Sequence, residues 1–308
     1  MVFVKYLLIS IMFILIISTL AMADMGAIIP YEKVSLTEPG QKAIIAHDGF
    51  EEMLILSTDF NVNTNAKVVR FIPFPSQVKI DIADPYIFQR IDSLIKKHNL
   101  SYLRFLRGKV EKKEGVDIIS VQTLGPHKII QVKVTNFEEF KVWVKKLFKD
   151  EGIEKKGFTQ KEEEVISFYL NRSMNFFVFD IVSLSEDINH IAPVVYRFNT
   201  NYFYYPLVTS SVIKGEGKIE LVIFTNQGGI SEKILRFISP HPWKVSETAI
   251  VTGEEMEKIY KELPKLMGAH AIMGVVQYRG PYNFSYDIWI EMPIYQIKPY
   301  NPYKKQKE

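Results

Sequence analysis

The side chains best suited to catalysis or metal binding are scattered along this 308-residue sequence. No two histidines have an H-x-H or H-x-x-x-H spacing, which would bring two imidazoles to one metal ion, and the chain contains no cysteine. The sequence therefore predicts no metal or cofactor site, and it favours an ordinary structural or surface role for each histidine. The six are His47, His98, His127, His190, His241 and His270.

Two carboxylates, Asp81 and Asp84, are close enough in sequence to suggest a general acid–base pair. Asp84, however, stands directly before a helical pattern, where its side chain is suited to capping the helix. The sequence has no G-x-S-x-G or G-x-x-x-x-G-K motif either, so we predict no catalytic residue. The alternative is an envelope-directed hydrolase with a dispersed active site, and a cleft joining His47 to both carboxylates would support it.

Prolines and aromatic rings give the candidate binding residues. In FIPFPS, Pro73 and Pro75 flank Phe74 within an alternating run, which predicts the end or edge of a strand because proline cannot donate to a sheet ladder. We expect Phe74 to face the core, and a binding edge is the second interpretation. The cluster NYFYYPL is suited to stacking on sugars or touching a membrane, although packing within a sheet is the favoured interpretation. Its candidate rings are Tyr202, Tyr204 and Tyr205.

The first residues have the three-part layout of a secretory signal. Lys5 supplies a positive charge, an apolar run follows from Tyr6, and Ala21-Met22-Ala23 supplies small residues for cleavage after Ala23. A retained anchor formed by residues 6–23 is the alternative, although that span is close to the minimum of about 20 residues for crossing a bilayer. Both interpretations predict an extracytoplasmic protein, secreted or held at the outer face of the cytoplasmic membrane. Export would also allow glycosylation at three sequons, which begin at Asn99, Asn171 and Asn283.

The charge balance argues against a nucleic-acid partner. The 38 Lys+Arg residues nearly match the 35 Asp+Glu residues, and the basic residues are spread along the chain rather than grouped. We therefore expect a non-catalytic protein that binds an envelope protein or glycan. The membrane is a partner only through the N-terminal segment, if that segment is not cleaved.

Four stretches have the caps and apolar spacing of amphipathic helices. Asp84 is expected to cap the first, with Pro85 in its first turn, and the other three begin with capping patterns of a polar residue followed by glutamate three positions later. These stretches are residues 83–100, 136–152, 159–173 and 252–267, and the later caps are Asn136 with Glu139, Thr159 with Glu162, and Thr252 with Glu255.

Most of the remaining chain alternates like β-strands. Asp48–Gly49 between two apolar runs predicts a hairpin over residues 41–56 with a type I′ turn, because Gly tolerates a positive φ and Asp tolerates it better than most residues. A second hairpin is expected around Gly125–Pro126, and residues 271–279 and 284–292 are expected to form a third. Further strands are expected at residues 67–74, 175–184, 193–199, 205–213 and 218–225.

Hairpins with interspersed helices indicate an α+β fold with mostly antiparallel sheet and about four amphipathic helices, preceded by the signal segment. The charged stretch KDEGIEKKG is the best internal boundary. The expected organisation is a signal or anchor over residues 1–23, an α/β subdomain over 24–150, a β-rich subdomain over 157–297 and a polar tail over 298–308.

Several landmarks occur together as a set. They are the QKAII strand, the turn His47–Gly49, the EEMLIL strand, the segment Ile72–Pro75 before a helix, the Trp143 helix, the passage FYLNRSMNFFVF and Tyr205–Pro206. From about residue 26 to residue 225 their order resembles exported archaeal and bacterial proteins catalogued as domain of unknown function 2330. His47 departs from the pattern, since many relatives carry an aromatic residue there. The resemblance implies export and no particular activity.

Overall fold

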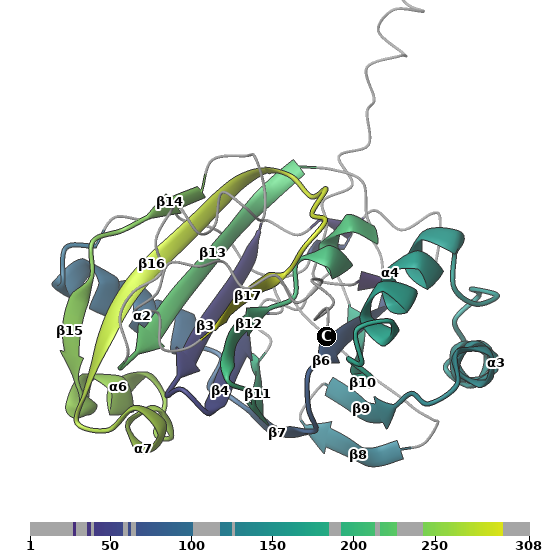
Figure 1. Cartoon of the computed structure of the whole chain (residues 1–308), viewed down its shortest axis with the longest axis horizontal. Coiled ribbons are helices and arrows are strands. Elements are labelled where there is room, and N and C mark those ends of the chain that lie inside the picture. Colours follow the sequence, from purple (N-terminus) through teal and green to yellow (C-terminus); the bar gives the residue numbers. More distant parts are fainter. Residues whose placement is uncertain are drawn as a thin grey trace, which may run out of the picture.

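The computed structural model describes residues 27–28, 36–37, 40–57, 61–62, 66–100, 118–124, 127–184, 192–212, 216–226 and 243–291. The expected signal segment and polar tail lie outside these residues. The described chain is a mixed α/β fold with two main sheets, mostly antiparallel, as predicted (Figure 1).

The larger sheet has the strand order β14–β16–β13–β3–β4–β11–β7, with β15 also paired to β16. All of its pairs are antiparallel except β13 with β3. Its strands are β3 (Gln41–His47), β4 (Glu51–Leu56), β7 (Val78–Ile82), β11 (Val194–Asn199), β13 (Glu216–Thr225), β14 (Trp243–Val245), β15 (Ala249–Thr252) and β16 (His270–Pro281).

The five-stranded sheet has the order β1–β6–β10–β9–β8, with every pair antiparallel. Two further pairs, β12 with β17 and β2 with β5, form small sheets of their own. The strands are β1 (Ala27–Ile28), β2 (Leu36–Thr37), β5 (Asn61–Val62), β6 (Ala66–Phe74), β8 (Ile118–Leu124), β9 (His127–Lys133), β10 (Phe176–Leu184), β12 (Tyr202–Tyr205) and β17 (Ile288–Glu291).

Both faces of the larger sheet are buried, so its strands feed two apolar cores. On β4, Leu54 and Leu56 point into the first core, which also contains the five-stranded sheet, α3 (Phe137–Asp150) and α4 (Gln160–Leu170). Met53 and Ile55 point into the second core, under α2 (Ile87–Lys97), α6 (Gly253–Ile259) and α7 (Leu263–Met267). Strand alternation explains the division, because successive side chains leave opposite faces of the sheet. Figure 1 places α3 and α4 beside the five-stranded sheet, away from α6 and α7.

The hairpin predicted at residues 41–56 is confirmed, but its turn type is not type I′. Strand β3 ends at His47 and β4 begins at Glu51, so the connection is three residues long. Gly49 has a φ of 111°, whereas Asp48 is not among the residues with positive φ, which type I′ requires at both central positions. Instead, Asp48 Oδ1 accepts the N–H groups of Phe50 and Glu51, both at 2.8 Å. The side chain of Asp48 thus replaces the backbone bonds of the tighter turn.

The helix caps were predicted well, with two corrections. Asn136, Thr159 and Thr252 each cap a helix, and the last two form complete capping boxes. The helix expected from Asp84 instead begins at Ile87, because Asp84 accepts the Tyr86 N–H in a turn before it. The helix expected over residues 252–267 is broken into α6 and α7. Tyr260 is extended there, four residues before Pro264, which has no N–H to donate to the Tyr260 carbonyl oxygen and whose ring would clash with that carbonyl in a continuous helix.

Two strand predictions were wrong. The stretch after Tyr205 turns into a short 3₁₀ helix, η1 (Val208–Val212), because Asp287 accepts the N–H groups of Leu207 and Val208. The predicted terminal hairpin does not form either, since β17 pairs with β12 and not with β16. Both outcomes depend on contacts between segments about eighty residues apart, which local patterns do not encode.

The charged stretch KDEGIEKKG, residues 149–157, does not separate the two sheets. Strand β10, which follows it, pairs with β6 and β9, which precede it. Strand β11 likewise lies between β4 and β7. Each main sheet is therefore built from chain on both sides of the expected subdomain boundary.

Candidate functional site

His47, Asp81 and Asp84 do not meet in one cleft. His47 is fully buried on the face of the larger sheet that carries Ile45, and its Nδ1 accepts the Gly49 N–H at 2.8 Å. Burial lowers the pKa of His47 to about 4, so the ring is neutral at pH 7. Asp81 leaves the opposite face, where it accepts the Tyr260 hydroxyl at 2.8 Å. The geometry that would have supported a hydrolase at these three residues is therefore not present.

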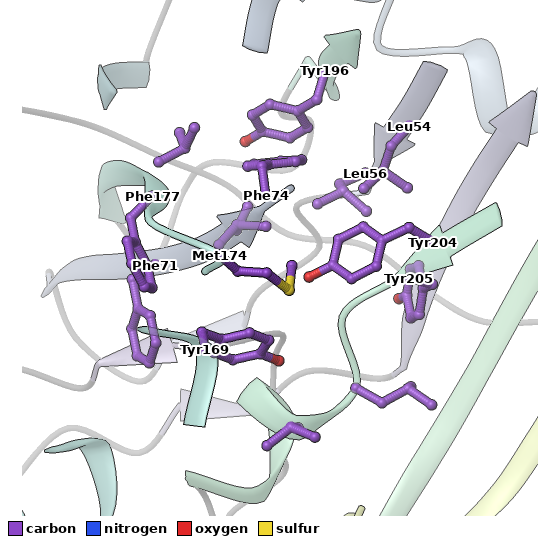
Figure 2. Close-up of a cluster of buried hydrophobic side chains, with 14 of the residues drawn as sticks. Leu54, Leu56, Phe71, Phe74, Tyr169, Met174, Phe177, Tyr196, Tyr204 and Tyr205 are labelled. Atoms are coloured by element: carbon purple, nitrogen blue, oxygen red, sulfur yellow. The ribbon is translucent and has the colours of Figure 1, made fainter. Parts of the chain in front are cut away.

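Most of the candidate binding residues lie in the interior. Phe74 is 0% exposed and packs on Tyr196, with ring centroids 5.2 Å apart, as Figure 2 shows. Tyr204 and Tyr205 are equally buried. The Tyr204 hydroxyl donates to the carbonyl oxygen of Pro73 at 3.0 Å, so a candidate ring and a candidate proline bind each other. Of the six residues, only Pro75 and Tyr202 are partly exposed.

The prolines were expected at the end or the edge of a strand, and they lie at the end of β6, which stops at Phe74. The edge alternative is wrong, because β6 lies between β1 and β10. The two residues of β1 pair only with Val69 and Arg70. At the proline end, Pro73 pairs with Phe177 of β10. In the described chain the prolines therefore lie beyond the stretch of β6 that is paired on both sides. At their position, the N–H that proline lacks would have no partner on the β1 side, so its absence costs no ladder bond.

A buried charged cluster connects three strands of the five-stranded sheet. Asp180 of β10 forms an ion pair with Arg70 of β6, and its Oδ1 lies 2.8 Å from Nδ1 of His127 on β9. All three residues are 0% exposed. Arg70 also donates to the carbonyl oxygen of Ser57 at 3.2 Å, and His127 Nε2 lies 2.8 Å from the carbonyl oxygen of Ala192. We call these three residues the Asp180 cluster.

The electrostatics of the Asp180 cluster favour an ionised carboxylate. Burial alone would raise the pKa of Asp180, but His127 and Arg70 outweigh burial and lower this pKa to about 2. Both ring nitrogens of His127 face oxygen acceptors, so neither is available to take a proton from a nucleophile. A His–Asp pair is thus present, but it is arranged to hold strands together rather than to catalyse.

The Asp180 cluster was not predicted, although the sequence contains a signal for it. Arg70 is the only charged residue inside VVRFIPF, and Asp180 is the only one inside NFFVFDIVSL. Opposite single charges within two strongly apolar strands predict a buried pair, because an unpaired charge would be too costly there.

A groove runs between α2 and α6 on the outer side of the second core, and its volume is about 440 Å³. Leu94 and Ile259 give it an apolar floor, and the exposed ring of Tyr86 stands at its rim. Its other lining residues are long and polar: Gln89, Arg90, Ser93, Lys97, Glu255 and Lys258. Sequence reasoning could not find this groove, because charged residues on the outer face of an amphipathic helix are usually only solvated.

Glu255 ties the two helices of the groove together. One carboxylate oxygen accepts from Lys97 Nζ at 2.5 Å and lies 3.0 Å from His98 Nε2. The other accepts the Thr252 N–H at 2.8 Å as part of the capping box. The Lys97 ammonium and then the Thr252 N–H lower the pKa of Glu255 to about 2, so this carboxylate stays ionised.

The other two cations of the groove are held loosely. Arg90 lies 3.3 Å from Asp84, and Lys258 lies 3.9 Å from Glu254. All four side chains are more than a third exposed, and exposed ion pairs of this kind contribute about 0–1 kcal/mol. A ligand with its own negative charges can therefore compete for Arg90 and Lys258.

Comparisons with known proteins add only a distant structural resemblance. No family model matches the chain, and no curated protein matches it. A crystal structure of a mutated baculovirus P35 after caspase cleavage is similar, at 8% sequence identity and a TM-score of 0.41, over 82% of this chain and 99% of that one. A likeness at this level supports no inference about function.

Two further features are absent from the described ranges. None of the helices there has the length and apolar character needed to cross a bilayer. Within the same ranges, no group of three or more His, Asp or Glu side chains is placed to hold a metal ion.

Proposed function

We propose that this chain is an exported, non-catalytic binding protein of the cell envelope, and that the α2–α6 groove holds a segment of an acidic glycan. The groove is the single observation that carries the proposal. Its lining has three cations and one carboxylate, and Glu255 is already neutralised by Lys97. The remaining Arg90 and Lys258 therefore favour an anionic occupant.

The rest of the lining suits a sugar chain. Gln89 and Ser93 supply amide and hydroxyl groups that hydrogen-bond to sugar hydroxyls, and the Tyr86 ring offers an apolar face on which a pyranose stacks. The groove lies on two helices over the second core, so its walls are preorganised. The resemblance to exported proteins of domain of unknown function 2330 and the N-terminal signal pattern support an envelope location.

Binding of oligogalacturonate, whose sugars carry carboxylates, tests the glycan proposal against a neutral maltooligosaccharide of equal length. The acidic probe is expected to bind at low salt and to weaken as salt is added. Arg90→Gln combined with Lys258→Gln is expected to weaken its binding about tenfold, which corresponds to about 1.4 kcal/mol. Lys146→Gln on α3 is the matched control, because it removes one exposed cation far from the groove. Equal binding of both probes, or equal weakening by the control, contradicts the proposal.

Sequencing the N-terminus of the protein from its native host tests the export proposal separately. Cleavage after Ala23 leaves Asp24 as the first residue. An intact chain in the membrane fraction supports the anchor, and recovery from the cytoplasm contradicts export in both forms.

A further inference from the structure

The protonation state of His127 follows from its two contacts. Its Nδ1 faces the carboxylate of Asp180, and its Nε2 faces the carbonyl oxygen of Ala192, both at 2.8 Å. Neither a carboxylate nor a carbonyl oxygen has a proton to donate, so each ring nitrogen must carry one. Only the doubly protonated imidazolium satisfies both contacts, and either neutral tautomer would place a lone pair against an oxygen.

The two acceptors belong to different parts of the fold. Asp180 lies within the five-stranded sheet, whereas Ala192 leads into β11 of the larger sheet. The next residue, Pro193, accepts the Ala83 N–H at 2.8 Å, which holds the same segment from its other side. Arg70 reaches the carbonyl oxygen of Ser57, just after β4, the strand that pairs with β11. The Asp180 cluster thus binds the chain just after β4 and just before β11, at the ends of two neighbouring strands of the larger sheet.

We propose that His127 is a proton-dependent tie between the two main sheets. With two protons the ring bridges Asp180 and Ala192. With one proton it keeps the contact to the Asp180 carboxylate, the stronger acceptor, and the Ala192 carbonyl in the chain entering β11 loses its donor from the five-stranded sheet.

The surroundings of the ring leave few other groups to share this proton. Within the described chain, Arg70 and Asp180 are its charged neighbours on β6 and β10, and Lys133 lies at the other end of β9, over the ring of Phe176. On the facing strands β4 and β11, the titratable side chains on this side are Glu52 and Tyr196. Glu52 lies at the far end of β4, where it accepts the N–H of Tyr204 at 2.7 Å.

Nitrogen-15 NMR of histidine-labelled protein tests the protonation state directly. At about pH 6, one buried ring is expected to show two protonated nitrogens, because both face oxygen acceptors. That signal should be missing in His127→Gln and kept in His270→Gln, which alters an exposed histidine at the start of β16. A neutral tautomer at His127 in the folded protein at this pH overturns the proposal.

Hydrogen exchange tests whether protonated His127 holds the chain that enters β11. As the pH is raised until the ring loses a proton, amides of β11 are expected to exchange at least tenfold faster after correction for the intrinsic rate. Amides in the middle of β16 should not change, and His127→Gln should show the fast exchange at every pH. If the variant does not fold, the titration of the unaltered protein still decides, because loss of the proton without faster exchange in β11 overturns the proposal.

Discussion

Replacing Asp287 with asparagine is expected to stabilise this protein at neutral pH, although it removes a buried carboxylate that forms hydrogen bonds. Asp287 is 4% exposed, and one of its oxygens, Oδ1, accepts all three of its hydrogen bonds. The donors are the Tyr169 hydroxyl at 2.9 Å and the N–H groups of Leu207 at 2.7 Å and Val208 at 2.8 Å. Asparagine keeps an Oδ1 in the same place and carries no charge, so these three bonds can persist.

The magnitude follows from the pKa. Burial raises the pKa of Asp287 from 3.8 to about 6, and the three donors only partly offset burial. A carboxyl group whose folded pKa is raised contributes its full stability below pH 3.8 and loses that stability as the pH rises through about 6. Two pKa units correspond to about 3 kcal/mol, the cost of ionising Asp287 in the folded protein near pH 8.

Urea unfolding of both proteins between about pH 4 and pH 8 measures this cost. The difference in unfolding free energy is expected to be near zero at about pH 4 and to reach about 3 kcal/mol in favour of Asp287→Asn at about pH 8. Subtracting the unfolding free energies of the two proteins at each pH cancels the contributions of other titrating groups. His47 is one of them, because its lowered pKa destabilises both proteins as the pH falls from 6.5 towards 4. Asp287→Ala is the control, because it leaves the donors unpaired and should destabilise at every pH. A flat difference, or a less stable Asp287→Asn at about pH 8, refutes the reasoning.

Three other substitutions have expected effects on urea unfolding. Phe74→Ala should destabilise by about 3 kcal/mol or more, because a fully buried ring leaves a cavity, whereas Phe50→Ala, at a ring that is 74% exposed, should change little. Gly49→Val should also destabilise, since a β-branched residue adopts a φ of 111° poorly, and an unchanged midpoint would contradict the turn. Asp180→Leu leaves two buried cations without their carboxylate and should cost about 3–5 kcal/mol, and an effect below about 1 kcal/mol would argue against the buried ion pairs.

The parts of the fold that the sequence predicted depend on neighbours in the chain. A capping box such as Thr159 with Glu162 closes within one helical turn, so four residues are enough to specify it. The hairpin at Asp48–Gly49 is equally local. Its exact turn was missed because side chains accept most of the loop N–H groups: Asp48 accepts those of Phe50 and Glu51, and His47 accepts that of Gly49.

The parts that the sequence did not predict depend on distant partners. Any exposed strand edge offers the same N–H and C=O groups, so nothing in the residues of β17 marks β12 as its partner rather than β16. The α2–α6 groove is a similar case, because its walls are brought together only by the packing of the second core. Three candidate binding residues chosen for their aromatic rings, Phe74, Tyr204 and Tyr205, instead lie in the interior, where such rings bury the most apolar area.

The Asp180 cluster explains how β6 and β10 keep one register. Both faces of these strands are buried, so an apolar pattern cannot distinguish the correct register from a slip of one residue. In the observed register Arg70 pairs with Asp180. A slip of β6 by one residue would turn Arg70 to the other face, where Trp143 packs on Phe179 at 5.2 Å. Leaving Arg70 and Asp180 buried and unpaired would cost several kcal/mol, a large share of the 5–15 kcal/mol that stabilises an ordinary protein. The two charges therefore select a single register for strands whose apolar residues would accept either.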